Sequence, residues 1–370
     1  MQSVPITSNF REDETFPSVS IIRPVKGIDT ELRACLEATF NLVYDGPVEI
    51  LICIAEESDP AITLVRQLIA ENAGVNCQLL VCNTDCGPNP KICNIAYAYA
   101  HAKHDIVWIL DANVWVSPNA LDQSIQSLAD CSLVHHLPLV IGISDDVGSF
   151  VEETFMATSH AKFYTAINTL RVAPCLMGKS NLFRRSDLGP IDRFAINICE
   201  DQLIGEYLWA KCGPHRFCPG IVAYQPIGNE LTFAGYWERR KRWLRIRKYV
   251  VTAATLVEPF TECFACGYVG ALAFAKWFPK WWFLGVHCCV WAVMDYYQFI
   301  NLFSQDINSP HRPTWLGNGP RSFPSFIKTW LFREICALPI WLDAMRGSKV
   351  SWRNKLFRVH RDKTVTAWNR

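Results

Sequence analysis

The chain has 370 residues, with 36 Lys and Arg against 35 Asp and Glu, and so a formal net charge of +1. Hydrophobic residues make up 50% and charged residues 19%, which excludes a disordered chain; the length suits roughly two domains of about 150 residues each. The charge is uneven, because residues 1–236 hold 15 basic and 27 acidic side chains (15 − 27 = −12) and residues 237–370 hold 21 and 8 (21 − 8 = +13). The two parts are therefore expected to meet different partners.

The N-terminal part alternates between short apolar runs and longer segments suited to helices. Residues 1–16 form a polar stub with neither a signal peptide nor a membrane span. Four apolar runs of strand length follow it, at 19–22, 48–55, 79–82 and 106–110. The segments between them, such as 60–73 and 91–103, predict helices. This βαβ rhythm predicts a parallel sheet covered on both faces, with ligands at the carboxyl ends of its strands.

Sixteen cysteines are scattered through the apolar segments, as small buried residues would be. We therefore expect reduced thiols and a location in contact with the cytosol. Cys263 and Cys266 have the C-x-x-C spacing of a metal site, but no second pair accompanies them, which favours two buried thiols.

From Trp237 onward the sequence becomes basic, rich in tryptophan and strongly apolar. Eleven of the 14 Trp lie there, and residues 238–248 (ERRKRWLRIRK) hold seven basic side chains and one acidic one. Two runs long enough to cross a bilayer follow at 249–275 and 281–303, joined by the short turn KWFPK. Acidic residues inside both runs indicate packing against protein along part of their length.

A third apolar segment, 323–341, also contains charged residues and predicts an amphipathic interfacial or re-entrant helix. The basic tail 346–370 has eight Lys and Arg and one acid. Basic flanks favour the cytosolic side, so we expect two spans and a surface-lying helix within a membrane region 249–345, with the tail in the cytosol.

Two aspartates follow predicted strands and are candidates for ligand binding. Asp59, in EESDP, is suited either to a ligand contact or to capping the helix that begins near Pro60. Asp111 directly follows the run IVWIL, a common place for a carboxylate that holds Mg²⁺ or Mn²⁺; the competing interpretation is an ordinary loop acid.

A second group of candidates lies later in the chain. Glu200 and Asp201 are adjacent, so only one is expected to face a given site; the pair is equally typical of a solvated first helical turn. A lone histidine such as His160 is more often structural than catalytic. Arg239 and Arg242 share a helix face beside Trp243, and paired guanidinium groups suit a diphosphate as well as lipid headgroups.

Taken together, these residue types fit glycosyl transfer from a sugar nucleotide. A metal-binding Asp and two arginines would stabilise the charge that develops on a leaving diphosphate, and an acid would act as the base for the attacking hydroxyl. Apolar segments beside such a site imply that the acceptor is a lipid.

Ten short motifs in one colinear order resemble the ceramide glucosyltransferases, inverting glycosyltransferases with a GT-A fold. They are PSVSIIRPVKGID (17–29), SDPAI (58–62), GPNPKICN (87–94), DAN (111–113), LVHHLP (133–138), TSH (158–160), ICED (198–201), RRKRW (239–243), EPFTECF (258–264) and SWR (351–353). The resemblance implies an α/β fold: a GT-A domain with a parallel or mixed sheet over 17–237, a basic interfacial segment 238–248, and the C-terminal helical membrane region.

The resemblance also implies roles for single residues. Asp59 would contact the uridine, Asp111 would hold a divalent cation, Mg²⁺ or Mn²⁺, at the diphosphate, and Asp201 would be the general base. Arg239 and Arg242 would bind UDP while Trp243 closes the site. His160 would line the donor or acceptor pocket; the remaining pocket candidates are Lys91, Glu200 and Asn113.

This chain departs from the family pattern in two places. Family members usually begin with a membrane anchor, whereas only the polar stub precedes Pro17; either an upstream segment is missing or the C-terminal segments suffice for anchoring. The metal motif is DAN, so Asn113 supplies at most a neutral ligand, and the ion would be held largely by the phosphates of the donor.

The resemblance predicts transfer of glucose from UDP-glucose to the primary hydroxyl of ceramide, with inversion. It implies a multi-pass protein of the Golgi or endoplasmic reticulum membrane whose catalytic domain faces the cytosol. A homo-oligomer is compatible with it, and no nucleic-acid partner is expected. The alternatives are transfer of N-acetylglucosamine to another lipid alcohol, such as a hopanoid, and a non-enzymatic membrane scaffold or transporter with a nucleotide-binding domain.

Overall fold

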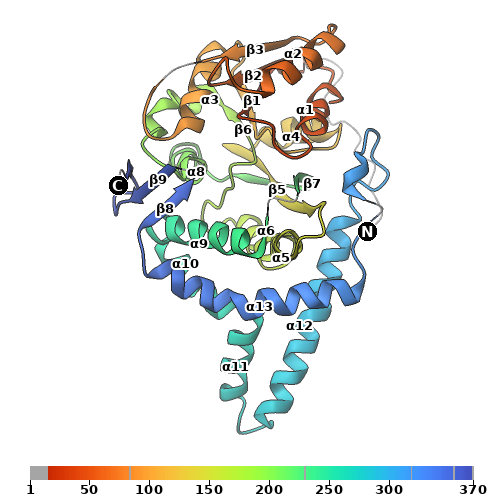
Figure 1. Ribbon diagram of the computed structural model, residues 1–370, viewed down its shortest axis with the longest axis vertical. Helices are drawn as coiled ribbons and strands as arrows, with labels where there is room; N and C mark the ends of the chain where they lie inside the picture. Colours follow the sequence, from red (N-terminus) through yellow and green to blue (C-terminus); the bar gives the residue numbers. More distant parts are fainter. Residues whose placement is uncertain (1–15, 83–84, 229–230, 318, 353–354, 369–370) are drawn as a thin grey trace.

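The computed structural model describes residues 16–82, 85–228, 231–317, 319–352 and 355–368 (Figure 1). The expected polar stub lies outside the described residues except for Phe16.

A seven-stranded sheet forms the centre of the N-terminal part, in the order β3-β2-β1-β4-β6-β5-β7. Its strands are β1 (Val19–Val25), β2 (Val48–Ile54), β3 (Cys77–Val81), β4 (Ile106–Leu110), β5 (Leu133–Gly142), β6 (Ser180–Arg184) and β7 (Arg216–Ile227). The first four are parallel, β6 runs antiparallel to both β4 and β5, and β5 and β7 are parallel. The predicted parallel or mixed α/β sheet is confirmed.

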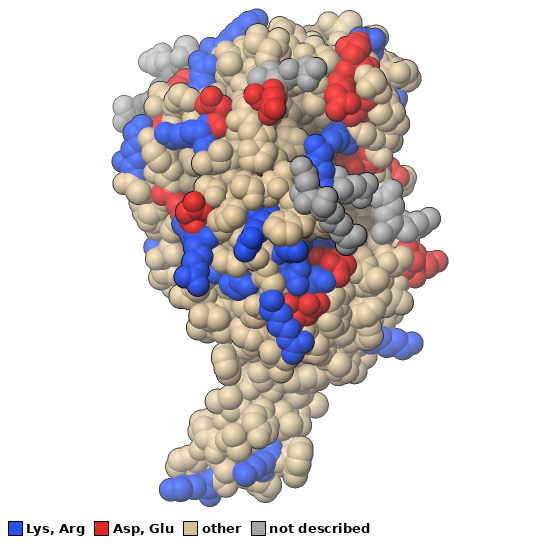
Figure 2. Space-filling view, turned by 60° about the vertical axis from the view of Figure 1, so that its left-hand side comes forward, with Lys and Arg blue, Asp and Glu red and all other residues tan. Residues whose placement is uncertain are grey.

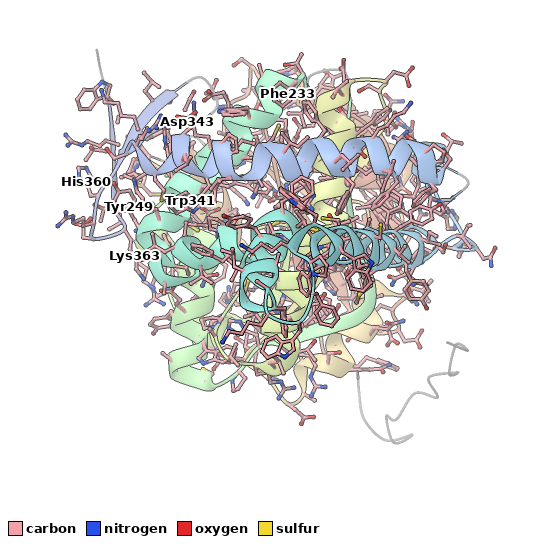
Figure 3. All side chains as sticks on the ribbon, turned by 90° about the horizontal axis from the view of Figure 1, so that it is seen from below. Phe233, Tyr249, Trp341, Asp343, His360 and Lys363 are labelled. Atoms are coloured by element: carbon pink, nitrogen blue, oxygen red, sulfur yellow. The ribbon has the colours of Figure 1, made fainter. Side chains whose placement is uncertain are left out.

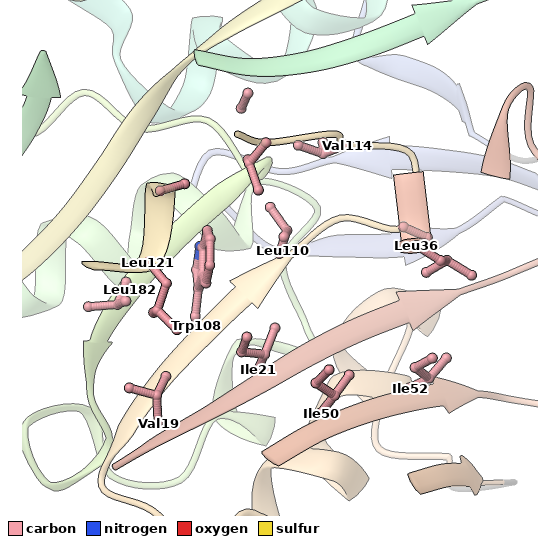
Figure 4. Close-up of a cluster of buried hydrophobic side chains, with 14 of the residues drawn as sticks. Val19, Ile21, Leu36, Ile50, Ile52, Trp108, Leu110, Val114, Leu121 and Leu182 are labelled. Atoms are coloured by element: carbon pink, nitrogen blue, oxygen red, sulfur yellow. The ribbon is translucent and has the colours of Figure 1, made fainter. Parts of the chain in front are cut away.

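Helices cover both faces of this sheet because successive strand residues point to opposite sides. Ile21 packs into the cluster with α1 (Leu32–Phe40), α2 (Ala61–Glu71) and α4 (Ala120–Leu128), which is drawn in Figure 4. Its neighbour Ile22 packs on the other face, with α3 (Pro90–His101) and α8 (Glu200–Cys212). The continuous apolar runs of the central strands are explained by this two-sided burial.

A second layer of helices lies beyond the β5 and β7 end of the sheet (Figure 1). It begins with α5 (Val147–Phe155), continues through one π-helical turn (Met156–His160), and ends with α6 (Ala161–Leu170); the short α7 (Arg185–Leu188) follows β6. The basic segment belongs to α9 (Phe233–Val250), an 18-residue helix that packs against α5 and α13.

The two expected membrane spans take a different form. The first is divided among the end of α9, α10 (Thr252–Val257), a 3-10 turn (Glu258–Thr261) and α11 (Cys263–Ala273). Pro259 has no backbone N–H to continue a helix, and α11, at about 1.5 Å per residue, rises only about 16 Å. None of the helices in the described parts of the chain is both long and apolar enough to cross a membrane.

The second expected span is α12 (Lys280–Phe303), which forms an antiparallel hairpin with α11 that projects from the body (Figure 1). Only its outer half leaves the body, because Asp295 near its middle is 1% exposed and accepts hydrogen bonds from Lys162 at 2.6 Å and from the Trp330 ring at 2.8 Å. The expectation that this run packs against protein along part of its length is confirmed. The buried Asp295 carboxylate needs the partners that this packing supplies.

The third segment forms α13 (Phe323–Met345), which crosses the base of the hairpin (Figures 1 and 3). Trp330, Ile340 and the charged Arg333 and Glu334 are buried, whereas the apolar Leu331, Ile335 and Leu338 are exposed. An interfacial or re-entrant position stays a prediction.

The basic tail is folded. It forms an antiparallel sheet of β8 (Lys349–Trp352), β9 (Lys355–Val359) and β10 (Val365–Ala367). Its inner side chains Val350, Phe357 and Val359 pack against Ile246 of α9. The alternation of basic and apolar residues in this segment is thus the two-residue period of strands with one buried face.

Candidate active site

A cluster of charged side chains lies at the carboxyl end of β4. Asp111 follows that strand, and its carboxylate lies 2.7 Å from Lys91 Nζ and 3.1 Å from Lys179 Nζ. Lys179 also donates to Asn113 Oδ1 at 3.3 Å, and Lys91 donates to the Gly178 carbonyl at 3.1 Å. The structure thus brings the predicted residues Lys91, Asp111 and Asn113 together.

The two lysines fix the charge of Asp111. Burial by itself would raise the pKa of this carboxyl, but the adjacent ammonium groups outweigh burial and lower the pKa to about 2. Burial disfavours the ammonium of Lys91, yet Asp111 and Glu200 raise its pKa above the ordinary value. The site therefore holds a charged aspartate between two cations at neutral pH.

Glu200 and Asp201 both lie beside this cluster at the first turn of α8. Glu200 is 3.5 Å from Lys91 Nζ, and a Cβ placed on Gly178 would meet both Asp201 Oδ2 and Lys91 Nζ at 3.2 Å. The expectation that only one of the adjacent acids faces the site is therefore wrong, because Glu200 and Asp201 both lie near Lys91.

Both acids have raised pKa values. Burial raises the pKa of Glu200 to about 7, partly opposed by Lys91 and reinforced by Asp201. Burial also raises the pKa of Asp201, against the effect of Lys91. A carboxylate whose pKa approaches neutrality is a stronger base than an exposed one, which is what proton removal from a hydroxyl needs.

Asn89 ties these elements together and was missed by sequence reasoning. This fully buried side chain accepts from the backbone N–H groups of Lys91 and Ile92 and thereby caps α3, while its amide donates to Glu200 at 2.9 Å and to the Asn197 carbonyl at 2.7 Å. The signal was present as an Asn directly before Pro90, which is a helix-start pattern.

Asp59 lies after β2, and its observed contacts are those of a cap. Its two carboxylate oxygens accept from Gly27 N–H at 3.0 and 2.8 Å, and one accepts from Ala61 N–H at 2.9 Å. The capping interpretation is confirmed, since the carboxylate joins the loop after β1 to the start of α2. A uridine contact stays a prediction.

The arginines of the R-x-x-R-W motif lie on α9 and contact different neighbours. Arg239 donates to the fully buried Glu152 at 2.8 Å and lies 4.6 Å from the centre of the Trp243 ring. Arg242 donates to the Ser351 carbonyl of β8 at 3.5 Å. The motif therefore also holds α9 against α5 and the C-terminal sheet.

His160 ends the π-helical turn and stacks on Tyr164, with ring centres 5.4 Å apart. Burial and the nearby cations Arg240 and Arg247 lower its pKa to about 3, so the ring is neutral at physiological pH. Its buried Nδ1 has no hydrogen-bond partner among the described residues.

The protein offers a divalent cation few ligands of its own. No group of three or more His, Cys, Asp or Glu able to hold an ion occurs within the described ranges. Asp111 and the Asn113 amide do provide two oxygens side by side, and Mg²⁺ is usually bound through one or two carboxylates with substrate phosphates completing the shell. In this structure the ammonium groups of Lys91 and Lys179 contact these oxygens, so an ion that arrives with a diphosphate would bind them only by displacing a lysine.

Comparison with known proteins shows the family to which this chain belongs. The sequence profile described as Glycosyl transferase family 21 matches residues 2–365. The chain belongs to this family. It is 36% identical to a ceramide glucosyltransferase of Komagataella phaffii, with 96% of this chain and 86% of that protein covered, and 33% identical to one of Candida albicans, with 96% and 88% covered. The family membership predicted from the ten motifs is thereby confirmed.

More distant relatives and solved structures are also similar. Ceramide glucosyltransferase 1 of Caenorhabditis elegans is 28% identical, with 94% of this chain and 72% of that protein covered. A mannosyltransferase of Pyrobaculum calidifontis, solved with GDP-mannose and Mn²⁺, is 14% identical with a TM-score of 0.46 over 87% of this chain and 90% of the other. TarS of S. aureus has a TM-score of 0.40 at 13% identity, over 92% and 96%.

Proposed function

We propose that this family 21 glycosyltransferase transfers glucose from UDP-glucose to the primary hydroxyl of ceramide, with inversion. The observation that carries the proposal is the placement of Asp201, with its raised pKa, beside Lys91 and Asp111 at the carboxyl end of the sheet. The names of the relatives supply the acceptor and the sugar, since these proteins are ceramide glucosyltransferases.

In the proposed reaction the ceramide oxygen attacks the anomeric carbon while the bond from that carbon to the diphosphate oxygen breaks. Asp201 takes the hydroxyl proton, and UDP departs with the electron pair of the broken bond. A single displacement of this kind converts an α-linked donor into a β-glucoside.

The basic side chains stabilise the negative charge of the departing diphosphate. Lys91 and Lys179 hold Asp111 in place, and Arg239 and Arg242 lie on the helix that the family resemblance assigns to UDP binding. A divalent cation, Mg²⁺ or Mn²⁺, held by Asp111 and the donor's phosphates would neutralise further charge when bound.

We also propose that the hairpin and α13 rest in a lipid bilayer. Large apolar side chains are exposed along the hairpin, including Trp277, Trp281, Trp282, Val290, Val293 and Met294. Figure 2 shows this projection almost without charge except for basic residues at its tip. An exposed apolar surface of this extent marks a membrane or partner site. The α13 helix beside it exposes Leu331, Ile335 and Leu338, which extends the apolar surface.

The cytosolic face of the Golgi or endoplasmic reticulum membrane is the proposed location, supported by the basic C-terminal part and by sixteen free thiols. Imaging of the tagged protein against markers of both membranes tests it.

The activity is tested with purified protein in lipid vesicles, a panel of UDP-sugars, and ceramide, diacylglycerol or sterol as acceptor. We expect transfer only with UDP-glucose and ceramide, and loss of transfer with near-normal UDP-glucose binding in Asp201→Asn. Transfer of N-acetylglucosamine, preference for another lipid alcohol, or near wild-type transfer by Asp201→Asn would contradict the proposal.

A further inference from the structure

The ammonium of Lys179 lies on the same two oxygens that the site offers to a divalent cation. Its Nζ is 3.1 Å from Asp111 Oδ2 and 3.3 Å from Asn113 Oδ1. The side chains of Lys179 and Asp111 are only 13% and 16% exposed. A metal ion on these oxygens would meet the ammonium at contact distance, where like charges repel strongly because little water screens them. Lys179 and the ion therefore compete for one position.

The backbone of Lys179 is fixed beside Asp111, whereas its ammonium is not. Lys179 directly precedes β6, and its carbonyl accepts from the Asp111 N–H at 3.0 Å. Its own N–H donates to the Met177 carbonyl at 2.7 Å. The charged group sits at the end of a flexible four-carbon stem. An ammonium displaced from Asp111 can therefore turn to another acceptor and still remain within the site.

The second lysine of the site, Lys91, is held differently. Its Nζ lies 2.7 Å from the other carboxylate oxygen, Asp111 Oδ1, donates to the Gly178 carbonyl at 3.1 Å, and is 3.5 Å from Glu200. Lys91 thus keeps two partners when Asp111 is taken by an ion. Both hydrogen bonds found for the Lys179 ammonium within the described residues end on oxygens that the ion needs. Lys179 is therefore the lysine that must leave.

The displaced ammonium would find its new acceptor on the donor. Burial lowers the pKa of Lys179, and so does the positive charge of Arg239, although Asp111 opposes both. Lys179 therefore lies close to the arginine that the family resemblance assigns to UDP. A diphosphate near both side chains offers charged oxygens to the ammonium and also carries the ion. Metal and nucleotide together can replace the contacts that Lys179 loses, which the ion alone cannot.

We propose that the divalent cation displaces Lys179 from Asp111 and Asn113, and that the freed ammonium binds the diphosphate of the donor. Because the free ion brings no acceptor for this ammonium, the site selects the metal–nucleotide complex over the ion. Binding of the ion and binding of the nucleotide therefore strengthen each other. This inference rests on the proposed function for the diphosphate donor, and it is independent of the acceptor.

The first experiment titrates Mn²⁺ into the protein without nucleotide and follows the EPR signal of the free ion. Lys179→Met removes the ammonium and should bind Mn²⁺ at least about tenfold more tightly than wild type, while UDP should increase the affinity for Mn²⁺ by a smaller factor. Lys363→Met is the control, because it removes the same charge from an ion pair with Glu206 elsewhere and should leave Mn²⁺ affinity within about twofold. An unchanged Mn²⁺ affinity in Lys179→Met, or an equal gain in Lys91→Met, overturns the proposal.

A second measurement uses the unaltered protein and does not depend on a variant folding. In a crystal structure of the wild-type protein with UDP and Mn²⁺, Lys179 Nζ should lie beyond the ion-pair distance of about 4 Å from Asp111 and within hydrogen-bond reach of a diphosphate oxygen. Mn²⁺ bound at Asp111 while Lys179 keeps its present contacts overturns the proposal. If the wild-type protein binds no UDP, the proposed function fails instead, and the nucleotide-free Mn²⁺ titration still decides whether Lys179 competes with the ion.

Discussion

Replacing Glu200 by Gln should make the protein more stable at alkaline pH and change little at acidic pH. Burial raises the pKa of Glu200 from an ordinary 4.5 to about 7, so the folded state binds more protons than the unfolded state between these values. Stability is therefore fully present below pH 4.5 and is lost as the pH rises through 7.

The size of the effect follows from the displacement of the pKa. At about 1.4 kcal/mol per unit, the penalty at pH 8 is on the order of 3 kcal/mol, which is an upper limit because the unfolded chain retains some structure. Gln is isosteric and uncharged, and its oxygen can still accept from the Asn89 amide, which lies 2.9 Å from the Glu200 carboxylate. It avoids the penalty without opening a cavity.

Urea unfolding in detergent micelles, followed by tryptophan fluorescence at pH 5 and pH 8, measures this difference. Glu57→Gln is the control, because Glu57 forms an exposed ion pair with Arg66 and its loss should have the same small effect at both values. A Glu200→Gln variant that gains no stability relative to wild type between pH 5 and pH 8 refutes the assignment of a buried carboxylate with a raised pKa.

Three further predictions concern the same site. Lys91→Met leaves the partly buried Asp111 with one cation instead of two and should lower the free energy of unfolding by about 1–3 kcal/mol in the same urea titration, since Lys179 remains; an unchanged free energy of unfolding contradicts the ion pair. Mn²⁺ should bind tightly only with UDP, measured as loss of the free-ion EPR signal, and Asp111→Asn should weaken that binding; tight binding without UDP contradicts the sharing of ligands. Arg239→Lys replaces a fork that contacts both Glu152 and Trp243 by a point charge, and should lower kcat/KM for UDP-glucose at least tenfold; equal kinetics would show that charge alone suffices.

The sheet and the strand-end acids were predictable because short apolar runs are a local signal. The residues around Ile21 and Ile22 are apolar on both faces of the strand, a pattern needed only where helices cover the sheet on both sides. Asp111 directly follows a run of the same kind. The Asp59 cap was equally readable, since an Asp two residues before a helix start is a local pattern.

The partners of these residues depend on long-range geometry and were not readable. Lys179 is 68 residues from Asp111 in sequence, and Asn89 is 111 residues from Glu200. No periodicity links such pairs, because the antiparallel β6 brings Lys179 to Asp111 only after the sheet has formed.

The C-terminal part shows a different limit. Hydropathy treated 249–275 as one span, whereas Pro259 and the ion-paired Glu258 and Glu262 divide it. The basic charge of 346–370 predicted a tail in the cytosol. The two-residue alternation of apolar residues in the same segment, which is typical of strands, was not used. That segment reaches the site, since the Lys363 carbonyl accepts from Asn197, whose own carbonyl accepts from Asn89.

The anomeric configuration of the product tests the proposed single displacement at Asp201 most directly. Purified protein is incubated with UDP-glucose and ceramide in vesicles, and the coupling constant of the anomeric proton is read by NMR. The proposed mechanism predicts β-glucosylceramide alone. An α-glucoside, or no glucosylated ceramide while UDP-glucose still binds, would contradict it.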